Sequence, residues 1–286
     1  MSFLSVDVDL AKKSYYAATV QRTQSFSKLQ DSVSCDVAVE DGGLAGLSAA
    51  IEVTDRGHSV VVLEAKKVGW GASGRNGGQA LEALACDQAT IEAQLGMIEA
   101  RRIWAMTSEA IALIQERCHR FEIECDWQSG YLSLAVNARK ANSVREWQHH
   151  IQAEYPFKTQ WTAQAGLPGW NASPRFHSGV FDTTSGHLNP LKYSLGLARA
   201  AASLGVKIYE HSTVNMLAQG ETVRFKTERG EVRAFHVLLA GNVYLGNATR
   251  FDTFSRLQHR SFPGGKLMRT PALVAGMAYH RLREML

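Results

Sequence analysis

The segment from Cys35 to Gln79 constrains the fold of this chain most strongly. Its parts are, in chain order, an apolar strand at 35–39, a glycine-rich turn at 41–46, a helix ending near Arg56, and an apolar strand at 59–63. Gly57 stands where a left-handed residue would end that helix. This order predicts a βαβ unit in an α/β fold with a parallel sheet, the architecture that binds dinucleotides.

The glycines of the turn lie where a pyrophosphate would need open backbone. Gly42 and Gly43 would let the main chain approach the phosphates at a helix N-terminus, and Gly46 would let the helix pack tightly on the strand. Glu64 follows Gly43 by 21 residues and ends the second strand. A carboxylate there accepts hydrogen bonds from a ribose 2′-hydroxyl and repels a 2′-phosphate, which disfavours NADP.

Asp41 departs from this fingerprint, because it stands where the first glycine belongs. Aspartate tolerates a left-handed backbone, so the turn can still form. Its carboxylate, however, would face a pyrophosphate of the same charge, and Glu40 adds a second acid where a buried strand should be apolar. A βαβ unit that binds no nucleotide is therefore the alternative on this segment alone.

A second glycine-rich run is more specific than the first. Residues 69–79 read GWGASGRNGGQ, and further matching segments lie at 14–18, 185–191 and 240–246. With these runs the chain resembles the FAD-dependent amine and amino-acid oxidases of the D-amino-acid oxidase superfamily, and within it the gamma-glutamylputrescine oxidases. The resemblance implies a glutathione-reductase-type FAD-binding fold, with a β-rich substrate domain that is truncated here.

The resemblance also implies FAD as cofactor and assigns it contacts. Gly42, Gly43 and Gly46 would lie under the pyrophosphate, Glu64 would hold the adenosine ribose, and the backbone of Val214 would meet the adenine. The second run would pass the pyrophosphate and the flavin ring; its residues are Ser73, Gly74, Arg75, Asn76, Gly77, Gly78 and Gln79.

The implied activity is oxidative deamination of a primary or secondary amine, with gamma-glutamylputrescine as a candidate substrate. In this family a hydride passes from the carbon bearing the amine to the flavin, and oxygen is reduced to hydrogen peroxide. Because the cofactor performs the chemistry, no side chain is named as catalytic, and His187 is interpreted as structural. Two alternatives stay open: a non-catalytic remnant with weak or no FAD binding, and an NAD-dependent dehydrogenase, which fits the first unit but not residues 69–79.

The end of the chain departs from the family. Residues from Arg250 onward resemble the family's C-terminus, whereas residues 240–246 resemble its middle, so the sequence reads as a member with an internal deletion near residues 247–249. The expected organisation is an N-terminal arm (1–33), an FAD-binding domain in two parts (34–121 and 185–248), a remnant of the substrate domain (122–184), and a terminal turn and helix (249–286).

Composition limits the remaining functions. The 286 residues are 45% hydrophobic and 20% charged, which suits a globular core. A net charge of +4 without a dense basic block gives no support for nucleic-acid binding. The four cysteines form no C-x-x-C pair, so we expect reduced thiols, no metal site and a cytoplasmic protein. We expect no membrane span, and self-association where missing strands leave apolar faces uncovered.

Periodicity predicts the other elements. Residues 88–120 form a helix with a possible break at Gly96, residues 138–153 and 190–204 form further helices, and residues 206–210 form a strand. Residues 222–239 form a hairpin whose second strand is parallel to its other neighbour. Residues 125–136 are predicted as a strand that turns at Ser129–Gly130, and the proline-containing stretch 156–184 as largely loop.

Overall fold

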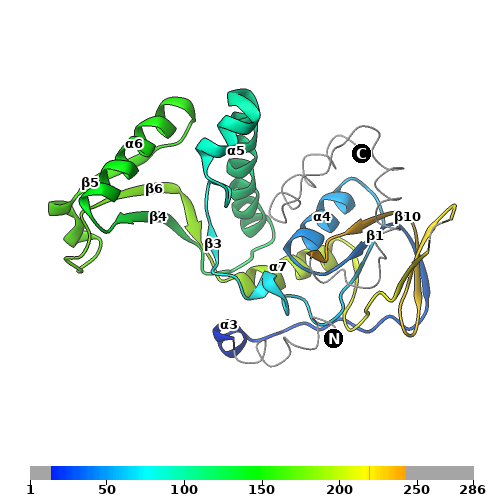
Figure 1. Cartoon of the computed structure of the whole chain (residues 1–286). Helices are drawn as coiled ribbons and strands as arrows, with labels where there is room; N and C mark the ends of the chain where they lie inside the picture. The colour runs from blue at the N-terminus through cyan, green and yellow to red at the C-terminus, as the bar shows by residue number, and fades with distance from the viewer. Residues whose placement is uncertain (1–13, 219, 243–286) are drawn as a thin grey trace. The chain divides into compact units, whose positions relative to one another are not determined.

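The computed structural model describes residues 14–218 and 220–242 (Figure 1). The chain divides into two compact units, and each is described by itself. The first contains the described residues of 14–77, 117–125 and 189–242, and the second contains residues 78–116 and 126–188. The expected terminal turn and helix, and the expected join at 247–249, lie outside the described residues.

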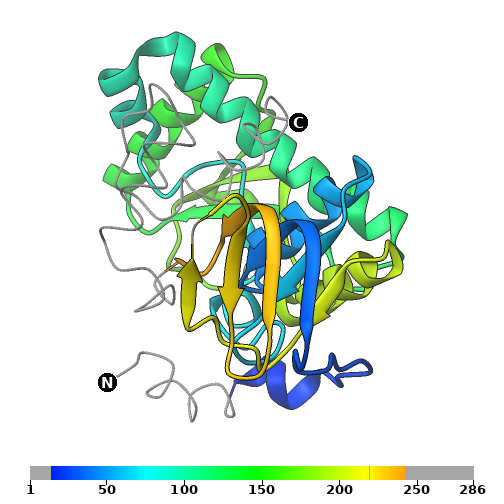
Figure 2. The same cartoon turned by 90° about the vertical axis from the view of Figure 1, so that its right-hand side faces the viewer.

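The first unit is built on a six-stranded sheet with the order β7-β2-β1-β10-β9-β8. Strands β7, β2, β1 and β10 are parallel, and β10, β9 and β8 are antiparallel. Figure 2 shows blue β1 beside gold β10. The strands are β1 (Ser32–Glu40), β2 (Val60–Leu63), β7 (Lys207–Tyr209), β8 (Met216–Ala218), β9 (Val223–Lys226) and β10 (Glu231–Leu239).

Helices α4 (Leu44–Asp55) and α7 (Pro190–Ser203) pack against each other in this unit, which also holds α3 (Tyr15–Thr19) and η1 (Ala72–Gly74). The predicted strand–turn–helix–strand order is confirmed, and so are the predicted helix at 190–204 and the hairpin at 222–239. Gly57 and Gly205 follow α4 and α7 with φ of +89° and +98°, the left-handed conformation that ends helices.

The core of the first unit is apolar and lies on both faces of the sheet. Every residue of β2 is buried, as in other strands that helices cover. Burying a side chain of this kind contributes about 1.5–3 kcal/mol, so the core supplies most of the stability of the unit. The largest side chains with under 2% exposure in this unit include Leu29, Leu47, Ile51, Leu63, Val68, Leu197 and Phe225.

The second unit contains an antiparallel sheet in which β6 pairs with β3, β4 and β5. Its strands are β3 (Gln79–Ala80), β4 (Gln128–Ala135), β5 (Thr159–Ala163) and β6 (Ser178–His187), and its helices are α6 (Ala138–Glu154), η2 (Gln164–Gly169) and α5 (Gln88–Arg120) up to Glu116. A core of Trp104, Ile151, Tyr155 and Phe157 lies in it.

Two sequence predictions for the second unit were wrong. Residues 156–184 are not mainly loop, because β5, η2 and most of β6 occupy them. Pro156 and Pro174 fall in the connections and Pro168 within η2, which leaves proline-free runs that pair as strands. The expected turn at Ser129–Gly130 is a register shift within β4, which Gly130 accommodates with a φ of +99°. Gly96, with a φ of +80°, interrupts α5 as predicted.

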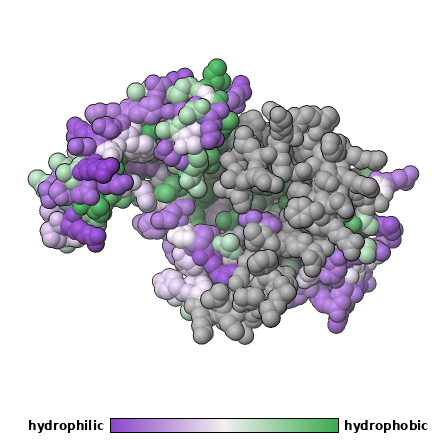
Figure 3. All heavy atoms as spheres, viewed as in Figure 1, coloured by the Kyte–Doolittle hydropathy of each residue, from purple (hydrophilic) through white to green (hydrophobic). Residues whose placement is uncertain are grey.

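The surface of the described chain mixes polar and apolar residues. The hydropathy view presents hydrophilic and hydrophobic residues side by side on the second unit (Figure 3). Ile98 in that unit and Phe235 in the first are large apolar side chains with 72% and 65% exposure. No helix within residues 14–218 and 220–242 is long and apolar enough to cross a membrane.

Candidate functional site

The candidate site lies at the turn between β1 and α4. Asp41 takes a φ of +87°, and its backbone N–H donates to the carbonyl of Leu63 at 2.9 Å. A Cβ on Gly46 would lie 2.0 Å from the carbonyl oxygen of Asp41, so only glycine fits where α4 packs on the turn. Asp41 therefore forms the left-handed turn that the fingerprint assigns to glycine, and its backbone is held on both sides.

The backbone donors at the N-terminus of α4 are already engaged by side chains of the protein itself. The N–H of Gly42 donates to Glu64 Oε2 at 2.9 Å, and the N–H of Leu44 donates to Ser73 Oγ at 3.0 Å. The N–H of Gly43, between them, donates to the carboxylate of Asp41. Three of the N–H groups that could bind an anion at this helix end, those of Gly42, Gly43 and Leu44, are therefore engaged within the protein.

Asp41 and Glu64 form a hydrogen-bonded pair of carboxyl groups. Glu64 is buried, with 6% exposure, and also accepts the N–H of Lys66 at 2.7 Å. Burial and the adjacent carboxyl of Asp41 hold the pKa of Glu64 well above its usual range, and burial also raises the pKa of Asp41. Two buried, hydrogen-bonded acids share a proton, because charging both of them would cost much free energy.

Glu40 adds a third acid at the end of β1. Its Oε2 is buried and has no hydrogen-bond partner within the part of the chain that the structure describes. Burial raises the pKa of Glu40 from 4.5 to about 7, and its charge also raises the pKa of Asp41. The end of β1 is therefore sensitive to pH near neutrality.

The second glycine-rich run is anchored in the first unit up to Gly77. Gly69 has a φ of +69°, and a Cβ on Gly74 would lie 2.0 Å from the carbonyl oxygen of Gly69. Ser194 of α7 donates from Oγ to the carbonyl of Ser73 at 3.2 Å. Asn76 donates from Nδ2 to the carbonyls of Ala72 and Ser73 at 3.1 and 3.0 Å. These contacts fix Ser73 opposite the N-terminus of α4.

The structure therefore brings together Gly42, Gly43, Gly46, Glu64, Ser73 and Gly74 in the first unit. The Arg75 guanidinium lies 5.3 Å from the centre of the Trp70 ring. Gly78, with a φ of +72°, and Gln79 belong to the second unit. The Val214 side chain is buried in the same apolar cluster as Leu63.

Two charged residues near the site were not predicted. Glu210 has 3% exposure, and its carboxylate accepts the N–H groups of Val68 at 2.8 Å and Phe26 at 3.2 Å. Arg22 donates to the carbonyl of Val68 at 2.7 Å, and the charges of Glu210 and Glu64 act on its guanidinium. The position of Glu210 after β7 matches that of Glu64 after β2 and could have signalled it, whereas nothing near Arg22 in the sequence does.

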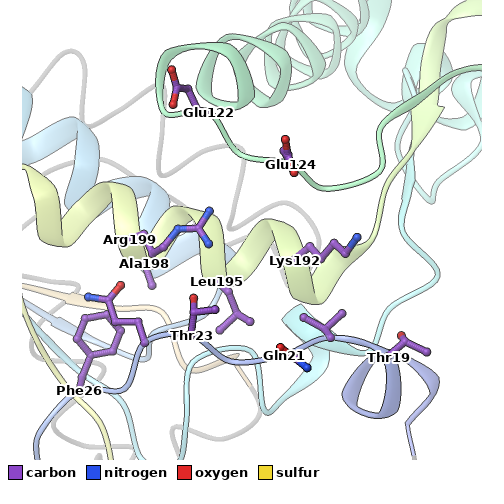
Figure 4. Close-up of a pocket in the computed structure, with 12 residues that line it drawn as sticks. Thr19, Gln21, Thr23, Phe26, Glu122, Glu124, Lys192, Leu195, Ala198 and Arg199 are labelled. Carbon is purple, nitrogen blue, oxygen red and sulfur yellow. The ribbon is translucent and has the colours of Figure 1, made fainter.

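The first unit also has a surface hollow of about 280 Å³. Lys192 and Arg199 of α7 and Glu122 and Glu124 of the loop after α5 line it (Figure 4). Both acids and Arg199 are exposed, so water solvates their charges and little binding energy is available from them. The glycine-rich turn, with its buried donors and acids, is the better candidate site.

Comparison with known proteins agrees with this geometry. The sequence profile of the family described as "FAD dependent oxidoreductase" matches residues 36–277. The chain belongs to this family. It is 35% identical to gamma-glutamylputrescine oxidoreductase of Escherichia coli over 88% of its own length and 58% of the relative. It is 37% identical to a probable oxidoreductase of Haemophilus influenzae over 82% of its length and 54% of the relative. The chain thus spans little more than half the length of these relatives.

Solved structures share the fold. L-amino acid deaminase from Proteus myxofaciens matches with a TM-score of 0.63 and 23% identity, over 79% of this chain and 48% of that chain. Glycine oxidase from Geobacillus kaustophilus matches with a TM-score of 0.62 and 20% identity, over 76% and 57% of the two chains. The predicted family and the FAD-binding fold of the glutathione-reductase type are confirmed, and FAD is the cofactor of this family.

The residues of the site fit FAD in shape but not in charge. Gly42, Gly43 and Gly46 are the small residues that the pyrophosphate fingerprint requires, and Ser73 Oγ lies 2.7 Å from where a Cβ on Gly43 would stand. The carboxylate of Asp41 also lies beside Gly43, since its Oδ2 is 3.1 Å from that Cβ position. The frame therefore suits the cofactor, and Asp41 opposes its phosphates.

Proposed function

We propose that the protein is an FAD-dependent oxidoreductase of the amine oxidase type. What supports this most is the glycine frame at the ends of β1 and β2, together with membership of an FAD-dependent family. Gly42, Gly43 and Gly46 would face the pyrophosphate, and Glu64 would accept hydrogen bonds from the adenosine ribose. The backbone of Val214 would meet the adenine.

The second glycine-rich run would lie along the flavin end of the cofactor. Small residues at Gly74, Gly77 and Gly78 would let backbone approach a flat ring, and Ser73 would turn its hydroxyl from Leu44 to the phosphates. Arg75, Asn76 and Gln79 complete the proposed contacts. FAD, when bound, supplies a hydride acceptor, so the task of the protein is to orient the amine and to exclude water. We assign no catalytic side chain.

The proposed substrate is a small molecule with a primary or secondary amine, and gamma-glutamylputrescine is the first to test because of the similarity to the Escherichia coli relative. The amine would lose a hydride to the cofactor, the resulting imine would be hydrolysed, and oxygen would be reduced to hydrogen peroxide. We further propose that residues 34–121 and 185–248 serve the cofactor and residues 122–184 the substrate. We also propose a cytoplasmic setting, in which the thiols of the protein would stay reduced.

A second candidate is a protein without catalytic activity that binds FAD weakly or not at all. The internal occupation of the α4 donors by Glu64, Asp41 and Ser73 favours it. The length of the chain also supports this candidate, because the chain covers only 54–59% of the length of three relatives. If part of the substrate domain is missing, the protein would not orient an amine against the cofactor. Apolar side chains such as Phe235 would then promote self-association.

Two measurements on one sample distinguish these functions. FAD is first titrated into the protein while its fluorescence is followed, and amines are then added to the complex without oxygen. Loss of the yellow absorbance with gamma-glutamylputrescine, followed by oxygen consumption on aeration, is the expected result. FAD binding without bleaching by any amine supports the non-catalytic protein, and absence of FAD binding under all conditions contradicts the proposed cofactor site.

A further inference from the structure

We propose that Asp41 is a built-in occupant of the pyrophosphate position, so that this protein takes up a proton when it binds FAD and binds FAD more tightly as the pH falls. The inference rests on the proposed FAD site and adds a regulation to it. It follows from the contacts of Asp41 and Glu64, from the fixed backbone of the turn, and from the charges around the pair.

The side chain of Asp41 stands where a phosphate would be bound. It accepts the N–H of Gly43, the residue that caps α4, and Ser73 engages the next N–H along the helix. The N-terminal end of a helix attracts negative charge, because its unpaired N–H groups point outward and the positive end of the helix dipole lies there. The Asp41 carboxylate therefore satisfies the same donors that FAD would require.

The backbone gives Asp41 little room to withdraw. Its N–H is hydrogen-bonded to Leu63 at 2.9 Å, and its carbonyl is packed against Gly46. The φ of +87° keeps the residue in a left-handed turn. Only rotation of the side chain can remove the carboxylate from Gly43, and such a rotation breaks its hydrogen bond to Glu64. Protonation is the remaining way to lower the repulsion of a pyrophosphate.

The charges around the pair favour this proton linkage. Two carboxyl groups act on Asp41: that of Glu64, which follows β2, and that of Glu40, at the end of β1. Arg22, from the segment before β1, is the cation whose charge acts on Glu64, and Glu210 after β7 shares that guanidinium. The N–H groups of Gly42 and Lys66 also act on Glu64. Among these described groups the acids outnumber the one cation, so an incoming pyrophosphate would raise the proton affinity of the pair further.

The test is the dissociation constant of FAD, measured between about pH 6 and about pH 8, where uptake of one proton raises affinity up to about tenfold per pH unit. Calorimetry in two buffers with different ionisation enthalpies measures the proton uptake directly and needs no variant. Wild-type protein is expected to take up a proton and to bind FAD more tightly at the lower pH.

Asp41→Asn is the matched variant, because asparagine accepts a left-handed backbone and keeps the shape of aspartate without its charge. It should bind FAD at least about tenfold more tightly than wild type near neutral pH and should lose most of the pH dependence. Asp31→Asn removes the same charge from an exposed side chain of the same unit and should behave like wild type.

Three results separate the possibilities. FAD binding that does not change with pH and takes up no proton overturns the inference while leaving the proposed cofactor site intact. An Asp41→Asn protein that folds and keeps the wild-type pH dependence also overturns it. A protein that binds no FAD at any pH, with aspartate or asparagine at position 41, overturns the proposed function and the inference together.

Discussion

The buried carboxyl group of Glu40 makes the stability of the first unit depend on pH. Glu40 ends β1, and its Oε2 has no hydrogen-bond partner among the described residues. Burial raises its pKa from 4.5 to about 7 in the folded protein. The stabilising contribution of the protonated group is therefore complete below about pH 4.5 and is lost as the pH rises through about 7.

The size of this effect follows from the change in pKa. One pKa unit is worth about 1.4 kcal/mol, so the rise from 4.5 to about 7 corresponds to about 3 kcal/mol. Glu40→Gln has nearly the same shape and does not ionise. Its free energy of unfolding should gain about 3 kcal/mol relative to wild type between about pH 4.5 and about pH 8.

Urea unfolding across this range measures the difference. A difference in the free energy of unfolding that stays constant with pH would reflect only how the amide packs. The test is therefore whether the difference between Glu40→Gln and wild type grows as the pH rises. Glu116→Gln removes a carboxyl from an exposed position and serves as the control. Parallel stability curves for Glu40→Gln and wild type would refute the argument that the carboxyl is buried without compensation.

Two further predictions concern the glycine-rich turn. Gly46→Ala should destabilise the protein by about 1–3 kcal/mol, because its Cβ would lie 2.0 Å from the carbonyl oxygen of Asp41. Gly169→Ala is the control, since its Cβ would meet nothing within 4 Å. Equal urea midpoints for the two variants would contradict the tight packing at Gly46. Asp41→Gly should raise FAD affinity in a fluorescence titration, since it restores the open turn and removes a carboxylate, and unchanged or weaker binding would contradict the role given to Asp41.

The local part of this fold could be predicted from the sequence. The segment from β1 to β2 is recognisable because its apolar strands, its glycines and its final acid, Glu64, lie close together in the sequence. The helix α7 was predicted from the spacing of its apolar residues and from Gly205, which follows it. Each of these elements is set by neighbours in the sequence, through turn geometry and periodicity.

Contacts between distant residues could not be predicted. The strands β5 and β6 are stabilised by pairing with each other, and β6 also pairs with β4, whereas the prolines outside these strands dominated the local sequence pattern. Arg22 contacts Val68, 46 residues away, and no local motif marks it. The sequence predicted that Asp41 would repel a phosphate. It did not predict the Asp41–Glu64 pair, which forms because the parallel strands β1 and β2 end at the same edge.

The flavin content of the purified wild-type protein tests the central claim most directly. The claim is that the chain keeps the FAD-binding frame of its family while Asp41 occupies the place of the pyrophosphate. The measurement is the ratio of yellow flavin absorbance to protein after purification in buffer without added FAD. A ratio well below a full complement is predicted. A full complement of tightly bound flavin would show that Asp41 does not oppose the phosphates and would contradict the account.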